Sequence, residues 1–105
     1  MRFKRKKNVL KVELTGELDL KVCPDLWKQL NSYIDREGIH HIFFDFREVP
    51  FIDSSGLGVL LSCYKRLAPY GGSVHVENLT PGVEMVFALA GMEKIIKISG
   101  MGRGA

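Results

Sequence analysis

Apolar and polar residues alternate in an imperfect period of two near the start of the chain. Leu10, Val12 and Leu14 occupy every second position of residues 9 to 14. This alternation is typical of a β-strand, because successive side chains of a strand point to opposite faces. The preceding stretch, residues 3 to 7, is expected to form a first strand.

From Val22 onwards the apolar residues follow the spacing of a helix. Pro24 lies near the first turn of this predicted helix, and Gly38 is expected to end it. Trp27 broadens the apolar stripe and is expected to pack in the core or at its rim. The stripe itself consists of Val22, Leu26, Leu30, Tyr33 and Ile34.

Three further short segments are expected to be strands. The run HIFFDF, residues 41 to 46, is apolar and bounded by charge. Its length and aromatic content predict a strand covered on both faces, as in the centre of an α/β sheet. Residues 73 to 79 predict another strand, and residues 94 to 98 predict a last short one.

Two more helices are predicted between these strands. The first is expected to end at Pro69 and the following glycines, and its apolar residues are Leu57, Leu60, Leu61, Tyr64 and Leu67. The second helix is expected to start at Thr80 and Pro81, which form a cap-then-proline signature. Its buried residues are expected to be Val83, Val86, Phe87 and Ala90. The alternation of strands and helices predicts an open α/β sheet with right-handed crossover helices.

The composition is that of one globular domain. The chain has 105 residues, of which 46% are hydrophobic and 26% are charged. No apolar run approaches the roughly 20 residues needed to span a bilayer, and the basic start lacks the apolar segment of a signal peptide. Cys23 and Cys63 fall within predicted helices without metal-ligand spacing. They are interpreted as reduced packing residues of a cytoplasmic protein.

The positive charge is concentrated at the start of the chain. Five of the fifteen lysines and arginines fall within the first seven residues. The rest of the chain therefore has ten basic and twelve acidic residues. Such a run is able to bind nucleic acid or anionic lipid. We favour a basic edge strand over residues 1 to 7, because no aromatic platform or recognition helix accompanies the charges. Residues 1 to 98 are expected to form the domain, and residues 99 to 105 a short flexible tail.

The stretch FIDSSGLGVLL, residues 51 to 61, places two adjacent serines where a strand gives way to a helix. The nucleophile elbow of hydrolases requires a glycine two residues before the serine as well as two after it. Ser54 has Gly56 after it but Ile52 before it, and Ser55 fails at both positions. The histidines are interpreted as satisfied or exposed strand residues, namely His40, His41 and His75. The sequence therefore argues against a serine hydrolase.

Signals for nucleotide or metal binding are weak. GLG does not meet the GxGxxG pattern, and the chain has no GxxxxGK[ST]. Asp19, Asp45 and Asp53 would be able to hold magnesium if they gathered near strand ends, but they are spread over three segments. The alternative for Asp53 is a cap or a loop-ordering acceptor. We therefore expect neither a metal nor a cofactor.

The residues alone leave two interpretations of the paired serines. Asp53, Ser54 and Ser55 all favour the N-cap of a helix, and a sequence does not place a helix boundary to one residue. In the first interpretation a serine simply caps the helix, which is worth about 1 kcal/mol. In the second, an exposed serine hydroxyl beside free backbone N–H groups accepts a phosphate group.

Three motifs together resemble the STAS-domain anti-sigma factor antagonists. They are TGELD at 15 to 19, FIDSSGLGVLL at 51 to 61, and YKRL followed by GG within 64 to 72. The similarity runs from about Val9 to Ile98, includes GMEKII, and is nearest to the sporulation members, the anti-sigma F factor antagonists. It implies a single small α/β domain with a mixed β-sheet.

The resemblance also implies a binding switch that has no catalytic activity of its own. Its partner would be an anti-sigma factor that is also an ATP-dependent serine kinase. The unphosphorylated form would bind this partner and free the sigma factor, phosphorylation would release it, and a serine phosphatase would reset it. The family's phosphoacceptor serine corresponds to Ser54. The resemblance places the partner contact at Asp19, Asp53, Ser55, Gly56 and Leu57.

Other members of the family usually continue into a further helix after the GMEKII-like segment, whereas this chain ends in a short glycine-rich segment. Two alternatives keep the fold and change the partner. They are an antagonist of a general stress-response pathway and a STAS subunit of a lipid-transport complex. Neither direct nucleic-acid binding nor membrane binding is expected.

Overall fold

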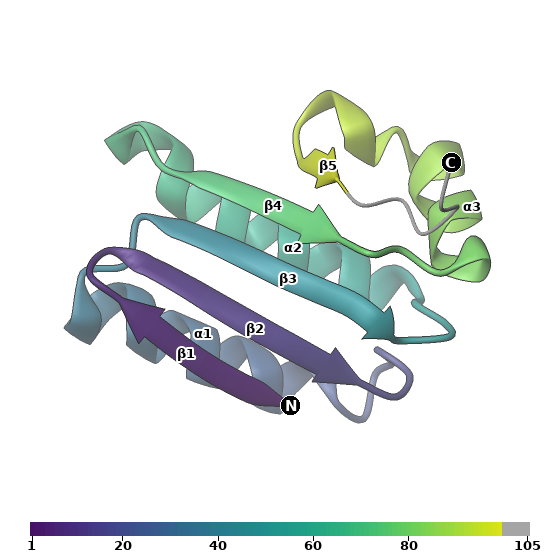
Figure 1. Ribbon diagram of the computed structural model, residues 1–105, viewed down its shortest axis with the longest axis horizontal. Coiled ribbons are helices and arrows are strands. Elements are labelled where there is room, and N and C mark those ends of the chain that lie inside the picture. Colours follow the sequence, from purple (N-terminus) through teal and green to yellow (C-terminus); the bar gives the residue numbers. More distant parts are fainter. Residues whose placement is uncertain (100–105) are drawn as a thin grey trace.

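The computed structural model describes residues 1–99 and contains a five-stranded mixed sheet (Figure 1). The strand order in space follows the order along the chain, with β1 antiparallel to β2 and all other neighbours parallel. The strands are β1 (Arg2–Lys6), β2 (Val9–Thr15), β3 (His41–Glu48), β4 (Ser73–Glu77) and β5 (Lys97–Ser99). The small mixed α/β sheet expected from the sequence is therefore confirmed.

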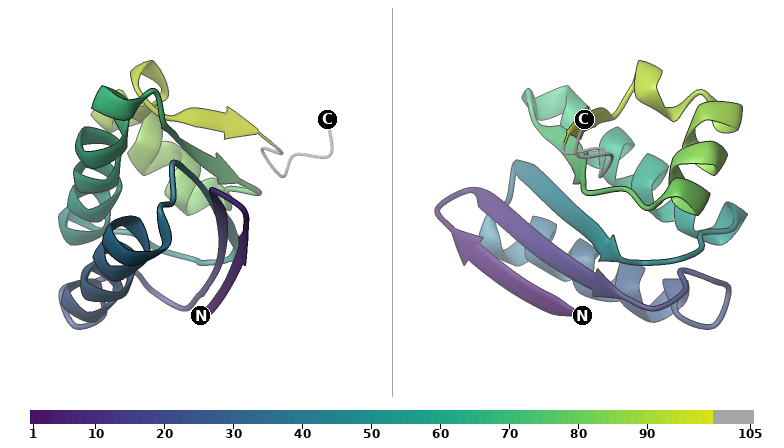
Figure 2. Two further views of the ribbon diagram at one scale, coloured as in Figure 1. Left: turned by 90° about the vertical axis from the view of Figure 1, so that its left-hand side faces the viewer. Right: turned by 45° about the vertical axis from the view of Figure 1, so that its right-hand side comes forward.

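Three α-helices connect the parallel strands, namely α1 (Cys23–Glu37), α2 (Ser54–Leu67) and α3 (Pro81–Ala90). Helices α1 and α2 lie side by side on one face of the sheet (Figure 2). Helix α3 packs near the end of β3, where Phe87 contacts Phe46 edge to face with ring centroids 5.8 Å apart. Within residues 1–99, no helix has the length and apolar content needed to cross a membrane.

Strand β3 corrects the expectation that residues 41 to 46 are covered on both faces. Ile42, Phe44 and Phe46 are fully buried beneath the helices, but the alternate residues are only partly covered. Phe43 lies on the open face, where its ring stacks on His75 with centroids 4.0 Å apart. Phe43 packs against a neighbouring ring of the same face, so its apolar side chain does not need a second helical layer.

The helix ends follow the predicted signals. Gly38 follows α1 in the left-handed conformation, with φ of 66°, which glycine adopts without a steric penalty. After α2 a short 3₁₀ helix, Ala68–Tyr70, leads to Gly71, which is also left-handed. Trp27 is half-buried against the core, as predicted.

The last part of the chain departs from the prediction. A 3₁₀ helix, Met92–Lys94, precedes β5, so the last strand begins later than the expected residue 94. Ala90 was expected to be buried but is exposed. Helix α3 fully buries only Val83 and Phe87. Ser99 belongs to β5, whereas the rest of the expected tail, residues 100–105, lies outside the described residues.

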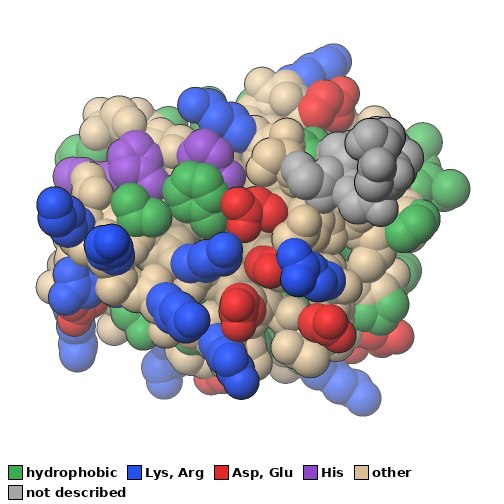
Figure 3. Space-filling view, in the orientation of Figure 1, with side chains coloured by type: hydrophobic (Ala, Val, Ile, Leu, Met, Phe, Trp, Pro, Cys, Tyr) green, Lys and Arg blue, Asp and Glu red, His purple; other side chains and the backbone are tan. Residues whose placement is uncertain are grey.

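The basic start of the chain forms β1 at one edge of the sheet. Phe3 stacks on Tyr33 of α1, and Arg5 forms an ion pair of 3.1 Å with Glu37 of the same helix. The alternation of side chains therefore directs Lys4 and Lys6 to the open face. Figure 3 shows that lysines, arginines, histidines and carboxylates cover much of this face.

Candidate functional site

The candidate site lies at the end of the sheet where the loops that follow β2 and β3 run together (Figure 1). Leu18 and Ile52 form a parallel bridge between the two loops. The Leu18 N–H donates to the Phe51 carbonyl at 3.1 Å, and the Asp53 N–H donates to the Leu18 carbonyl at 3.2 Å. These bonds extend the parallel ladder and hold the loop before α1 against the start of α2.

Asp53 is the N-cap of α2. It has extended backbone angles, and its Oδ1 accepts hydrogen bonds from the N–H groups of Ser55 at 2.8 Å and Gly56 at 3.4 Å. The interpretation that a serine caps the helix is therefore wrong, whereas the capping interpretation of Asp53 is confirmed. The expectation of free N–H donors is also wrong at Ser55 and Gly56, because Asp53 accepts from both.

Ser54 is the first residue of α2 and is exposed to solvent. Its position next to the cap places its hydroxyl at the positive end of the helix dipole. Ser55 and Leu57 follow on the same first turn and are half-buried. The fold therefore presents one of the two serines openly and partly covers the other.

Gly56 is buried beneath the two loops. A Cβ atom at this position would lie 2.5 Å from Ile52 Cγ1 and 3.1 Å from Leu18 Cβ. Contacts this short require the neighbours to move, so a glycine is needed for the helix start to approach the loops. The structure thus gives Gly56 a packing role in the isolated chain.

Asp19 orders the loop that leads into α1. Its Oδ1 accepts hydrogen bonds from the N–H groups of Lys21 at 3.0 Å and Val22 at 3.2 Å. Its carbonyl accepts from the N–H groups of Val22 at 3.1 Å and Cys23 at 3.0 Å. Asp19 is half-buried, and its carboxylate orders the loop.

The two cysteines are free and buried, as expected for packing residues. Burial raises the pKa of the Cys23 thiol, and the carboxylates of Asp53 and Asp19 raise it further. Burial also raises the pKa of Cys63, to about 12. Both side chains therefore remain thiols at neutral pH.

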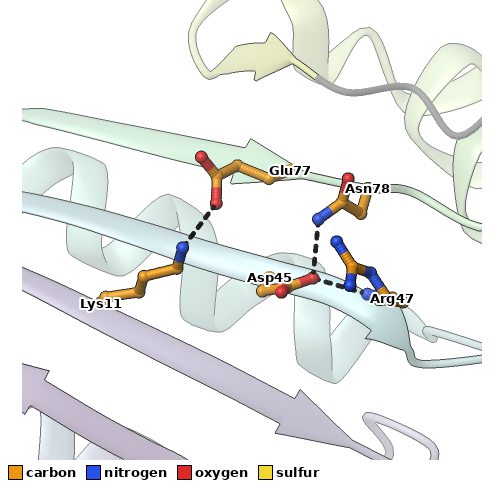
Figure 4. A network of polar contacts seen from close by, with 5 residues as sticks. All are labelled: Lys11, Asp45, Arg47, Glu77 and Asn78. Atoms are coloured by element: carbon orange, nitrogen blue, oxygen red, sulfur yellow. Dashed lines mark hydrogen bonds and ion pairs between the residues drawn. The ribbon is translucent and has the colours of Figure 1, made fainter.

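Asp45 does not join the other two aspartates. Its side chain lies on the open face, where it accepts hydrogen bonds from the Arg47 N–H at 2.9 Å and from Asn78 Nδ2 at 3.1 Å (Figure 4). Burial alone raises the pKa of Asp45, but these hydrogen bonds lower it below its usual value. Among residues 1–99 no group of three His, Cys, Asp or Glu residues is arranged to hold a metal ion.

Two exposed apolar residues in the two loops of the site were not singled out from the sequence. Leu20 is 72% exposed and Phe51 is 46% exposed. Leu20 follows Asp19 in the loop and belongs neither to the alternation of β2 nor to the stripe of α1. An apolar residue outside every periodic pattern is the signal by which the sequence would have revealed it.

A family model described as the STAS domain matches residues 1–100. The chain belongs to the STAS domain family. Its fold agrees with that of the anti-sigma factor antagonist SpoIIAA. The unphosphorylated form of SpoIIAA matches with a TM-score of 0.84 and 23% identity over 92% of this chain and 85% of that one. The phosphorylated form from Bacillus matches with a TM-score of 0.75 and 22% identity over 92% of this chain and 88% of that one.

Curated relatives of higher identity carry related names. The anti-sigma F factor antagonist of Paenibacillus polymyxa is 36% identical over 92 residues, which are 88% of this chain and 79% of the relative. The anti-sigma-B factor antagonist of Bacillus subtilis is 31% identical over 101 residues, which are 96% of this chain and 91% of the relative.

Proposed function

We propose that this chain is a cytoplasmic anti-sigma factor antagonist that is switched off by phosphorylation of Ser54. One observation carries the proposal: Ser54 is exposed at the first position of α2 while Asp53 already caps the helix. The Ser54 hydroxyl is therefore accessible to a kinase, and the helix does not need it as a cap. The antagonists among the relatives support this class of function.

The partner is an anti-sigma factor that also acts as an ATP-dependent serine kinase. In its unmodified form the chain binds this partner through the helix start and the adjoining loop, with Asp19, Asp53, Ser55 and Leu57 at the contact and Gly56 buried beneath it. This binding releases the sigma factor. A serine phosphatase restores the unmodified form after the kinase has acted, and the chain itself catalyses neither step.

Electrostatics explains why a phosphate group at Ser54 would end the binding. The group adds roughly −1.5 to −2 charges at neutral pH. The helix dipole offsets such a charge by only about 0.3–1 kcal/mol at an exposed site, and Asp53 already accepts from the Ser55 and Gly56 N–H groups. In a closed interface the phosphate would also lose its water and face the Asp53 carboxylate, at a cost of several kcal/mol.

Mass spectrometry tests the proposal. The full chain is incubated with ATP and the anti-sigma serine kinase of the organism that encodes it, and its intact mass is recorded. We expect the addition of one phosphate group, which fragmentation maps to Ser54. Stable labelling of Ser55 or of an aspartate would contradict the assignment, as would the absence of any label.

A second candidate keeps the switch and changes the pathway. The similarity to an anti-sigma-B factor antagonist extends over 96% of this chain, which favours a general stress-response antagonist as the alternative to a sporulation antagonist. Parallel titrations with an anti-sigma F factor and an anti-sigma-B factor separate the two. The partner that binds more tightly identifies the pathway.

A further inference from the structure

Gly58 is a glycine that the isolated chain does not need. It lies in the interior of α2, where glycine is less favourable than any residue except proline. A Cβ atom built on Gly58 would have no other atom within 4 Å, in contrast to a Cβ atom on Gly56. The backbone of α2 is helical at this position and has no positive φ among its residues. Neither packing nor backbone conformation therefore explains the glycine.

Gly58 lines a shallow hollow between α1 and α2. The hollow has a volume of about 310 Å³, and its other walls include Leu20, Cys23, Trp27, Ser55 and Val59. Most of these side chains are apolar. We call this feature the α1–α2 hollow. Figure 2 shows the two helices side by side, and the residues that line the hollow belong to the first halves of both helices and to the loop before α1.

The α1–α2 hollow adjoins the phosphorylation site proposed above. Ser55, which lines the hollow, follows Ser54 directly on the first turn of α2. Leu20 also lines the hollow and is 72% exposed, so most of its surface is available for contact. Exposed apolar surface beside a small hollow is typical of a protein contact site, where a few apolar anchors carry most of the binding energy.

We propose that the α1–α2 hollow receives an apolar side chain of the anti-sigma factor, with Gly58 as its floor and Leu20 as its rim. This inference rests on the proposed function, because it names where the same partner is anchored. Gly58 lacks a side chain so that the partner approaches the backbone of α2 closely. A phosphate group at Ser54 would then lie beside the bound side chain of the partner and prevent it from entering the hollow.

Substitution of Gly58 tests the floor of the hollow. The variant Gly58→Leu places a good helix former in open space, so we expect its melting temperature to rise by ~2–8 °C or to stay unchanged. Its affinity for the anti-sigma factor should fall at least ~10-fold, which is about 1.4 kcal/mol. Affinity is thus expected to fall without any loss of stability, which a purely structural role for Gly58 would not produce.

Ala88 supplies the matched control. It is exposed on α3, outside the α1–α2 hollow. The variant Ala88→Leu therefore adds an exposed leucine to a helix away from the proposed contact and should bind within about twofold of the unmodified protein. An equal loss of affinity in Ala88→Leu and Gly58→Leu would overturn the proposal.

Truncation of Leu20 tests the rim. Leu20→Ala should weaken binding at least ~10-fold, the loss expected of an apolar anchor. The control is Leu89→Ala, because Leu89 is 83% exposed on α3 and should be replaceable without loss of affinity. Circular dichroism on both variants checks the fold. Binding by Leu20→Ala that equals binding by Leu89→Ala would contradict the proposed rim.

The same titrations separate failure of this inference from failure of the proposed function. If the unmodified protein binds no anti-sigma factor, both proposals are wrong. If Ser54→Asp abolishes binding while Gly58→Leu and Leu20→Ala bind as the unmodified protein does, the switch stands and the α1–α2 hollow is not the anchor.

Discussion

The starts of α2 and α3 both carry a hydroxyl residue, but the fold uses the two hydroxyls differently. At α3 the N-cap residue Thr80 does not cap with its side chain, and its hydroxyl donates to the Val49 carbonyl at 2.7 Å. At α2 the cap is Asp53, and Ser54 is exposed on the first turn. The Thr80 hydroxyl therefore links the start of α3 to the loop that follows β3, whereas the Ser54 hydroxyl does not cap a helix.

This difference shows how to distinguish a structural hydroxyl from one that is available for chemistry. The position at a helix start does not decide it, since both residues lie there. The partner of the hydroxyl and the identity of the cap decide it. A serine is freed for modification when an adjacent residue takes over the cap, as Asp53 does beside Ser54.

The largest expected effect is on binding by Ser54→Asp. The added charge meets the Asp53 carboxylate in a site that loses its water on binding. We expect affinity for the anti-sigma factor to fall at least ~100-fold, which is about 2.7 kcal/mol. Isothermal titration calorimetry measures the loss, and circular dichroism should show an unchanged fold. Ser54→Ala adds no charge and should still bind; equal affinity of the Asp and Ala variants would break the electrostatic account.

Removal of the cap should destabilise α2. In Asp53→Ala the Ser55 and Gly56 N–H groups lose their acceptor, so we expect the free energy of unfolding to fall by about 1 kcal/mol, within the 0.5–2 kcal/mol range of N-cap losses. Urea denaturation measures it. Asp53→Asn is the matched control, because asparagine also caps well, and it should retain most of the stability. Full stability in the alanine variant would mean that a serine takes over the cap.

A smaller effect on the free energy of unfolding is expected when the hydroxyls of Thr80 and Ser54 are removed in turn. Thr80→Val removes the hydrogen bond to the Val49 carbonyl and should lower the free energy of unfolding by about 1 kcal/mol. Ser54→Ala removes an exposed hydroxyl without a capping role and should change it by less than about 0.5 kcal/mol. Thermal unfolding of both variants makes the comparison. A larger loss at Ser54 than at Thr80 would reverse the roles given to the two residues.

The smallest expected effect concerns the open face. Lys4 and Lys6 of β1 point to this face, on which Phe43 and His75 stack. Replacing both lysines by glutamine should leave binding of the anti-sigma factor within a few-fold at physiological salt, because exposed charges are screened there. Titration at two salt concentrations checks this. A large loss with a steep salt dependence would add β1 to the interface.

The sequence predicted the elements well, because their signals are local. The stripe beginning at Val22 and the left-handed stop at Gly38 gave α1 within one residue of its observed bounds. Coverage of β3 was not predictable in the same way. The adjacent apolar residues Ile42, Phe43 and Phe44 fit both a second helical layer and a Phe43–His75 stack, and only the assembled sheet distinguishes the two.

The candidate site was predictable in its position but not in its details. The motif located the paired serines at the start of α2, yet three consecutive residues suit an N-cap, and only the observed hydrogen bonds select Asp53. Gly56 and Gly58 are indistinguishable in the sequence. The first is crowded by Leu18 and Ile52 from two separate loops and the second is open, a difference that depends on contacts between distant segments.

The central claim is that a phosphate group on Ser54 ends binding to the anti-sigma factor. The most direct measurement is a pair of titrations of that partner, one with the unmodified chain and one with the chain phosphorylated enzymatically and shown by mass to carry one phosphate on Ser54. The phosphorylated protein carries the full charge, so the result does not depend on how well aspartate imitates it. We predict at least ~100-fold weaker binding for the phosphorylated protein. Equal affinities for the two forms would contradict the account.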